Sequence, residues 1–327
     1  MRSHANPRQE TLERTADLLR KSGFYLLDLQ TFRPRSFDLL GRRDSLLLLI
    51  KVLKNVDALG EEGAASLQNI AWMMRGFPLL VGTASGSQPL ENGVVYNRYG
   101  LCIMTFETME DYLINGVPPF LFSSPGGIFA RIDGRRLKAL REEHLVSLGA
   151  VADAVGVSRR TIQLYEEGAG AEVEVVERLE RFFGAPLATP INPFGDRGSG
   201  RAREASESEP GQEETTDRMT ESVVAELGGQ GWRVRLVSRG PFDALARPEH
   251  HAAELLVMGV GDLENAARRA RWLHDIARVA EGWSLFVVPE LRSHESIEGT
   301  PLVAVNELKR RRDPESLFEL IEERSDW

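Results

Sequence analysis

The chain has 327 residues, of which 42% are hydrophobic, and a formal net charge of −9 at pH 7. This length and composition indicate two or three domains with well-formed cores. The negative charge excludes a general affinity for polyanions, so any binding of nucleic acid has to come from a local basic patch.

The composition also excludes several kinds of site. Cys102 is the single cysteine, so the chain has no intrachain disulfide, and its apolar neighbours are typical of a small core residue. The longest apolar run, at 46–50, is too short to cross a bilayer, and the first residues lack the apolar segment of a signal peptide. The six histidines show no metal-ligand spacing. We therefore expect a cytoplasmic protein with no membrane partner, no metal and no cofactor.

The first expected domain, residues 1–120, alternates helices and strands. Helices are expected where apolar residues recur at a spacing of three or four, and strands at short apolar runs between turn residues. The expected elements are helices at 9–21, 71–74 and 110–114 and strands at 46–52, 79–81 and 100–104.

The second expected domain, residues 128–192, is helical. Its centre predicts a helix, a tight turn and a second helix. Gly156 supplies the backbone freedom that the turn needs, and Ser158 can cap the second helix through its hydroxyl. Ile162 and Tyr165 of that second helix are expected to be buried.

The outward face of the second helix is polar and carries Arg159, Arg160 and Gln163. Arginine and glutamine have the forked geometry that matches guanine and adenine edges in the major groove, where a helix-turn-helix places its second helix. Residues 131–163 have a local charge of +3, from seven cations and four acids. These features predict a basic face with a modest, salt-sensitive affinity for DNA.

Two further helices, at 133–143 and 173–183, are expected to flank this pair. The inward residues of the second flanking helix are expected to be Val173, Val176, Leu179, Phe182 and Phe183. With the stretches Leu140-Arg141-Glu142-Glu143, Ser147-Leu148, Gly156-Val157-Ser158-Arg159-Arg160-Thr161-Ile162 and Tyr165-Glu166, the domain resembles the Cro/Xre class of DNA-binding domains. The family often carries a glutamine early in its first motif helix, where this chain has Leu148-Gly149-Ala150.

A linker and a repeat of the first pattern are expected in the rest of the chain. Residues 195–217 hold no branched aliphatic or aromatic side chain, which is typical of a disordered linker. The last expected domain, 218–327, repeats the order of the first one. In both, a glycine and an aromatic residue are followed by Phe-Asp, a buried strand, a helix with a tryptophan and two more strands. The Phe-Asp pairs are Phe37-Asp38 and Phe242-Asp243.

The order helix, strand, strand, strand, helix, strand, helix resembles the restriction-endonuclease-like fold. Nucleases of that fold hold a divalent metal with two acids and use a lysine beside the attacking water. The resemblance implies that Asp38 and Lys51 stand at the aspartate and lysine positions of the first copy, with Leu49 at the second acid position and Glu13 as a helix acid.

In the second copy, Asp243 matches the aspartate, and Leu256 and Met258 are expected at the two other positions. Because both metal cradles are incomplete, we expect degenerate copies without catalytic residues, in which Glu13, Asp38 and Lys51 are relics. The alternatives for Asp38 are a bond to local backbone or a structural salt bridge with Lys51.

The two outer copies, the Cro/Xre pattern and the phrase at 31–40 together resemble the family of archaeal HTH-type (Cro/Xre-like) transcriptional regulatory proteins over essentially the full length. The expected fold class is α/β plus all-α, with two restriction-endonuclease-like mixed-sheet domains flanking a Cro/Xre-type helical DNA-binding domain. The resemblance implies a regulator that is not an enzyme.

Three hypotheses follow. The first is a sequence-specific regulator that binds double-stranded DNA as a homodimer of its outer domains. Its candidate base contacts are Arg159, Arg160 and Gln163, and its candidate phosphate contacts are Ser158, Thr161 and Arg136. The second is a metal-dependent, structure-selective nuclease using the amino-terminal domain, and the third an adaptor whose outer domains bind another protein. The basic run at 309–312 is either a solvated loop or a further phosphate contact.

Overall fold

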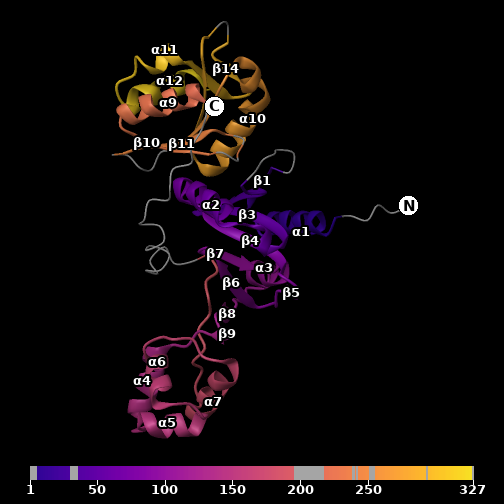
Figure 1. Ribbon diagram of the computed structural model, residues 1–327, viewed down its shortest axis with the longest axis vertical. Coiled ribbons are helices and arrows are strands. Elements are labelled where there is room, and N and C mark those ends of the chain that lie inside the picture. Colours follow the sequence, from indigo (N-terminus) through magenta and orange to yellow (C-terminus); the bar gives the residue numbers. More distant parts are fainter. Residues whose placement is uncertain are drawn as a thin grey trace, which may run out of the picture. The chain divides into compact units, whose positions relative to one another are not determined.

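A computed structural model describes residues 6–29, 36–194, 217–237, 240, 242–249, 255–291 and 294–325 (Figure 1). The chain divides into two compact units: the first holds residues 1–52, 58–79 and 204–327, and the second holds 53–57 and 80–203. Of the expected linker at 195–217, only Asp217 is among the described residues. Residues 31–35, which begin the phrase at 31–40, also lie outside them. The domain boundaries expected from the sequence stay predictions.

The amino-terminal part of the first unit contains three antiparallel strands between two helices. Its elements are α1 (Pro7–Lys21), β1 (Tyr25–Asp28), β2 (Leu39–Arg43), most of β3 (Leu46–Asn55) and α2 (Glu61–Met74). The end of β3 and most of the short 3-10 helix η1 (Val56–Ala58) belong to the second unit. β1 pairs with β2, and β2 pairs with β3. Residues 47–50 of β3 are all buried. Because both faces of the strand are covered, its sequence is a continuous apolar run without alternation.

The carboxyl-terminal part of the first unit is built on a mixed six-stranded sheet. Its elements are α9 (Arg218–Gly229), β10 (Trp232–Leu236), β11 (Ala244–Pro248), β12 (Leu256–Val260), α10 (Leu263–Ala280), β13 (Trp283–Val288), β14 (Ser296–Ile297), β15 (Thr300–Ala304), α11 (Val305–Leu308) and α12 (Pro314–Arg324). The strand order is β10-β11-β12-β13-β15-β14, with β12, β13 and β15 parallel. Leu227 of α9 and Leu317 and Ile321 of α12 pack in one core with the strands.

These two parts repeat one pattern, which confirms the internal repeat. In each, a helix leads through a glycine with positive φ into a strand: Gly23 has φ +81° and Gly231 has φ +85°. In each, two further antiparallel strands and a helix follow. Asp38 and Asp243 both stand directly before the second strand of their copy.

The strand register corrects one sequence-based expectation. Leu39, the first residue of β2, lies opposite Ile50, and the first residue of β11 lies opposite Met258. Ile50 and Met258 are therefore equivalent, and the residue that follows each of them is equivalent too. Gly259, and not Met258, stands at the position of Lys51.

The second acid position shifts in the same way and is held by Val257, and not by Leu256. The expectation was wrong because a run that is buried on both faces carries no alternation from which the register can be derived. Gly259 also packs tightly: a Cβ there would overlap the ring of Phe286. A lysine side chain at this position has no space.

β4 (Phe77–Ser85) begins in the first unit and ends in the second. The second unit then continues with short strands and helices. Its further elements are β5 (Gln88–Pro89), β6 (Val94–Arg98), β7 (Leu101–Met104), α3 (Phe106–Leu113), β8 (Leu121–Ser124), β9 (Gly127–Ala130), α4 (Gly134–Glu143), α5 (Leu148–Val155), α6 (Arg159–Glu166) and α7 (Val173–Phe183). Cys102 lies in β7, where burial raises the pKa of its thiol to about 12. A raised pKa disfavours the thiolate form that acts as a nucleophile.

Helices α4 to α7 enclose one core, and all four confirm the helices expected from the sequence. The core includes Leu137, Val151, Ile162, Leu179 and Phe183, one or more from each helix. Every helix in the described ranges is too short or too polar to span a bilayer.

Val173 and Phe182 are the exceptions among the expected core residues of α7. Val173 is only partly buried, and Val175, which was not among the expected residues, lies in the core instead. The side chain of Phe182 is 43% exposed and meets the ring of Phe183 edge to face, with centroids 4.8 Å apart. Successive residues of a helix point about 100° apart, and here the core takes Phe183 and leaves Phe182 at the surface.

Candidate nucleic-acid interface

Local hydrogen bonds define both helices of the central motif. Ser147 caps α5 by accepting the N–H of Ala150 at 3.1 Å, and Ser158 caps α6 by accepting the N–H of Thr161 at 3.0 Å. Between the helices, Gly156 ends α5 with φ +73°, a conformation that glycine adopts without strain. The turn expected from the sequence is present, and the start of α6 is the part that a helix-turn-helix presents to base edges.

α6 buries one face and exposes the other. Ile162 is fully buried and Tyr165 is 8% exposed, whereas Arg159, Arg160 and Gln163 are all exposed. This pattern agrees with the expectation that the two arginines and the glutamine face outward. Their contact with bases stays a prediction.

The polar side chains at the start of α6 are already engaged with one another. The hydroxyls of Ser158 and Thr161 lie 2.8 Å apart. The side-chain amide of Gln163 donates to Glu167 at 3.1 Å, one turn further along the helix. Such exposed pairs are worth about 0.2–0.5 kcal/mol, so the side-chain amide of Gln163 can leave Glu167 at little cost.

Gly149 of α5 makes room for the side chain of Arg159. A Cβ at position 149 would lie 2.7 Å from Nε and 2.9 Å from Nη2 of Arg159, so the guanidinium rests directly on the helix backbone. The sequence departs from the Cro/Xre pattern at this glycine. The structure places the charge of Arg159, from the next helix, beside the start of α5.

Arg141 is a residue of this domain that sequence reasoning misjudged. Its Nε and Nη2 contact the two carboxylate oxygens of Glu166 at 2.5 and 3.1 Å, and this hydrogen bonding raises the pKa of Arg141. The pair joins α4 to α6, which also approach closely at Gly134, where a Cβ would overlap the carbonyl oxygen of Tyr165. Arg141 therefore adds no free charge to the basic face.

Arg136 remains available on α4, which packs against α6. Its side chain is exposed, and its backbone N–H donates to the cap residue Asp133 at 3.0 Å. The motif thus places Ser158, Arg159 and Thr161 together at the start of α6 and Arg136 on the neighbouring helix.

At the relic site of the first copy, Asp38 is buried and held by an arginine. Nη2 of Arg8, from α1, lies 2.8 Å from Oδ2 of Asp38, and the N–H of Val52 donates to the same oxygen at 2.8 Å. Arg8 also donates through Nε to the carbonyl of Val52 at 2.8 Å. The sequence suggested Lys51 as the partner of Asp38, and the structure places Arg8 there.

The other two relic candidates have different surroundings, and the role of Lys51 beside Asp38 stays a prediction. Glu13 is exposed on α1 and accepts a hydrogen bond from Gln9 at 2.9 Å. Lys51 is half-buried in β3, whereas Asp38 is fully buried. Glu13 therefore faces solvent and not the aspartate with which it would share a metal.

The second copy repeats the arrangement with a different helix. Oδ2 of Asp243 accepts the N–H of Val260 at 2.7 Å and lies 2.9 Å from Nη1 of Arg269. Arg269 belongs to α10, the counterpart of α2, whereas Arg8 belongs to α1. The two copies thus bring an arginine to the same carboxylate from different helices.

These residues do not fit the divalent metal of the nuclease fold. A magnesium site in this fold needs a second acidic ligand, and the equivalent positions hold Leu49 and Val257. In both copies a guanidinium already neutralises the aspartate. Across the described ranges, no three histidine, cysteine, aspartate or glutamate side chains lie close enough to hold a metal ion.

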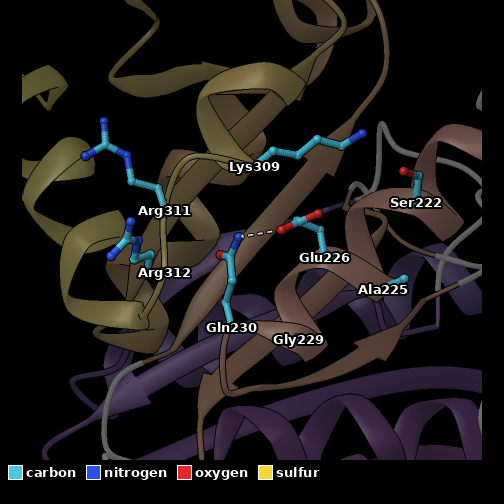
Figure 2. Close-up of a pocket in the computed structure, with 8 residues that line it drawn as sticks. All are labelled: Ser222, Ala225, Glu226, Gly229, Gln230, Lys309, Arg311 and Arg312. Carbon is cyan, nitrogen blue, oxygen red and sulfur yellow. Dashed lines mark hydrogen bonds between the residues drawn. The ribbon is translucent and has the colours of Figure 1, made fainter.

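Three cations of the basic run at 309–312 line a hollow of about 500 Å³ beside α9: Lys309, Arg311 and Arg312. Figure 2 shows Lys309 extending to one side of the connecting chain and Arg311 and Arg312 to the other. Glu226 of α9 lines the same hollow. Because the cations do not converge and an acid lies among them, the run agrees better with a solvated loop than with a phosphate site.

Comparison with known families assigns two parts of the chain. The PD-(D/E)XK superfamily domain matches residues 8–119, and a helix-turn-helix domain matches residues 134–189. A solved chain described as "Structure of a Type III CRISPR defence DNA nuclease activated by cyclic oligoadenylate" is 16% identical, and the match covers 80% of this chain and 41% of that one. Its TM-score of 0.23 is too low to support an argument about fold or activity.

Three archaeal proteins are similar over nearly the full length. The protein of Methanocella arvoryzae is 35% identical over 96% of both chains, and that of Methanosarcina barkeri is 37% identical over 94% of both chains. The protein of Halorubrum lacusprofundi is 35% identical over 97% of this chain and 98% of its own. Each carries the name "Putative HTH-type transcriptional regulatory protein".

Proposed function

Because the chain belongs to this family of archaeal HTH-type transcriptional regulatory proteins, we propose that it is a cytoplasmic, sequence-specific regulator that binds double-stranded DNA through α6. The observation that carries the proposal is the capped start of α6, whose Arg159, Arg160 and Gln163 are exposed while Ile162 and Tyr165 anchor the helix in the core.

We assign different roles to the exposed side chains of this surface. Arg160 and Gln163 read base edges, since a bidentate arginine or glutamine discriminates bases by about 1–3 kcal/mol. Ser158, Thr161 and Arg136 contact phosphates and set the register of the helix on the duplex. Arg159 reads a base at the start of α6. Because its guanidinium lies against α5, it also comes near the DNA backbone on the α5 side of the motif.

We propose that the outer domains are non-catalytic and serve dimerisation or the binding of a protein partner. The support is chemical: each aspartate at the metal position is paired with an arginine, and the second acid position is apolar in both copies. A mixture of the protein, magnesium and duplex or branched DNA should leave the DNA intact. Cleavage that requires magnesium and is lost in Asp38→Asn would contradict this part of the proposal and leave DNA binding by α6 untouched.

The test of sequence-specific binding begins with selection of bound fragments from random DNA by the full-length protein. Arg160→Ala should then weaken binding to the selected sequence by about 1–3 kcal/mol and have little effect on random DNA. Arg181→Ala, an equal charge change on the exposed side of α7, is the matched control. Failure to enrich any sequence, or equal loss on both DNAs, would exclude base reading by Arg160.

A salt titration separates the phosphate contacts from the base contacts. Arg136→Ala should weaken binding to all sequences alike and reduce the dependence of affinity on salt by about one unit of slope. Thr161→Ala should weaken binding with little change in slope, because a neutral hydroxyl releases no counterion. An unchanged slope for Arg136→Ala would remove that residue from the interface.

A further inference from the structure

The two outer repeats contact each other through two equivalent hydrogen bonds, one in each direction. Nε of Arg42, in β2, donates to the carbonyl of Val279 in α10 at 2.5 Å. Nε of Arg247, in β11, donates to the carbonyl of Met73 in α2 at 2.5 Å. Each repeat thus uses an arginine of its second strand to satisfy a carbonyl near the end of the other repeat's helix, where no intrahelical partner exists.

The four residues of these contacts are equivalent within the repeat. Arg42 and Arg247 each stand four positions after the aspartate of the Phe-Asp pair. Met73 and Val279 each stand two positions before the residue that ends the helix in a left-handed conformation, Arg75 in α2 and Glu281 in α10, both with φ +53°. Arg42 of the first repeat therefore contacts the second repeat in the same way as Arg247 of the second repeat contacts the first.

The packing of the elements is reciprocal as well. α10 of the second repeat packs against β1 and β2 of the first repeat. α2 of the first repeat packs against β11, which is the strand equivalent to β2. A contact in which the same patch of two copies meets itself is the mark of a two-fold, isologous interface. In this chain both copies belong to one polypeptide and to one compact unit.

We propose that the outer repeats form a pseudo-two-fold pair within one chain. In each repeat, the second strand and the carboxyl-terminal end of the helix after the third strand make one face, and this face binds the same face of the other repeat. The partner that this face fits is the other repeat of the same chain. The face is thereby closed to a second chain, and any homodimer that forms on DNA uses other surfaces. This inference holds whether or not α6 reads DNA.

The charges at the interface break the two-fold symmetry in one place. Nη1 of Arg42 pairs with Glu281 of the other repeat at 2.9 Å. At the equivalent place, Arg247 faces Arg75, and burial together with the charge of Arg75 lowers the pKa of Arg247 to about 10. At this place the first half of the interface has an arginine and a glutamate, and the second half has two arginines.

This asymmetry gives a test on the full-length protein by thermal unfolding. Glu281→Arg gives the first half two arginines, as in the second half, and removes the ion pair of Arg42. It should lower the melting temperature by about 2–4 °C. Arg75→Glu makes the second half attractive like the first and should raise it. Glu319→Arg, the same charge change on the exposed side of α12, is the control. If both interface variants behave like this control, or if Arg75→Glu lowers the melting temperature, the equivalence of the two halves is wrong.

Light scattering decides whether the contact lies within one chain. The double variant Arg42→Ala with Arg247→Ala should melt at a lower temperature and keep the molar mass of the parent protein at every concentration. Because Arg75→Glu is expected to gain stability, it provides the same readout on a protein that folds. A mass that halves in the double variant, or changes in Arg75→Glu, would show that the repeats pair between chains and would overturn the proposal.

Discussion

The two aspartates of the repeat sit in similar hydrogen bonds but in different surroundings. Both accept the N–H of a residue of the third strand, Val52 at 2.8 Å for Asp38 and Val260 at 2.7 Å for Asp243. The side chain of Asp38 is fully buried, whereas that of Asp243 is 28% exposed.

The cation that meets each aspartate also differs in origin. Arg8 reaches Asp38 from the helix before the sheet, and Arg269 reaches Asp243 from the helix after the third strand. The difference shows that the fold fixes the carboxylate and its backbone partner, while the balancing charge can come from any helix that passes nearby. The burial of each arginine–aspartate pair then determines how much that pair stabilises its repeat.

The largest expected effect is that of Arg8→Met. It leaves the buried carboxylate of Asp38 without its guanidinium, and removing one partner of a buried ion pair destabilises a protein by about 3–5 kcal/mol. The free energy of unfolding in urea measures the loss. Arg20→Met, whose partner Asp17 is exposed, should cost less than about 1 kcal/mol. Equal losses in the two variants would show that Arg8 does not balance a buried charge.

A smaller effect is expected from Gly259→Ala in the second copy. The added methyl group overlaps the ring of Phe286 and lies 3.0 Å from Leu273, and such overpacking costs about 1–3 kcal/mol. The equivalent change in the first copy, Lys51→Ala, shortens a half-buried side chain and should cost less. Chemical denaturation of both variants compares one position in two copies, and a harmless Gly259→Ala would contradict the tight packing of this position against Phe286.

The smallest expected effect is that of Arg269→Met. Its pair with Asp243 is partly solvated, so we expect a loss of about 1 kcal/mol, at the upper end of exposed pairs. The same denaturation series measures it. A loss as large as that of Arg8→Met would show that exposure does not distinguish the two sites.

Much of the central domain could be predicted from the sequence, because its signals are local. Gly156 and Ser158 end one helix and begin the next through contacts within a few residues. The spacing of Ile162 and Tyr165 identifies the buried face of α6, and the remaining face must be exposed.

The partners of the charged residues could not be predicted in this way. Arg8 and Asp38 are 30 positions apart, and Arg141 and Glu166 are 25 positions apart. Their pairing depends on how helices are placed on the sheet or on one another. No periodicity carries that information, and the sequence suggested Lys51 only because a lysine in a buried run needs a partner.

The order of the main helices and strands, the internal repeat and the outward face of α6 follow from the sequence, because helical period, caps and turn residues act over short distances. The register of β12, the cations that meet Asp38 and Asp243, and the reciprocal contacts of Arg42 and Arg247 became visible only in the folded protein. A strand buried on both faces has no pattern that fixes its register, and ion pairs and interfaces join residues that approach each other only once the chain has folded.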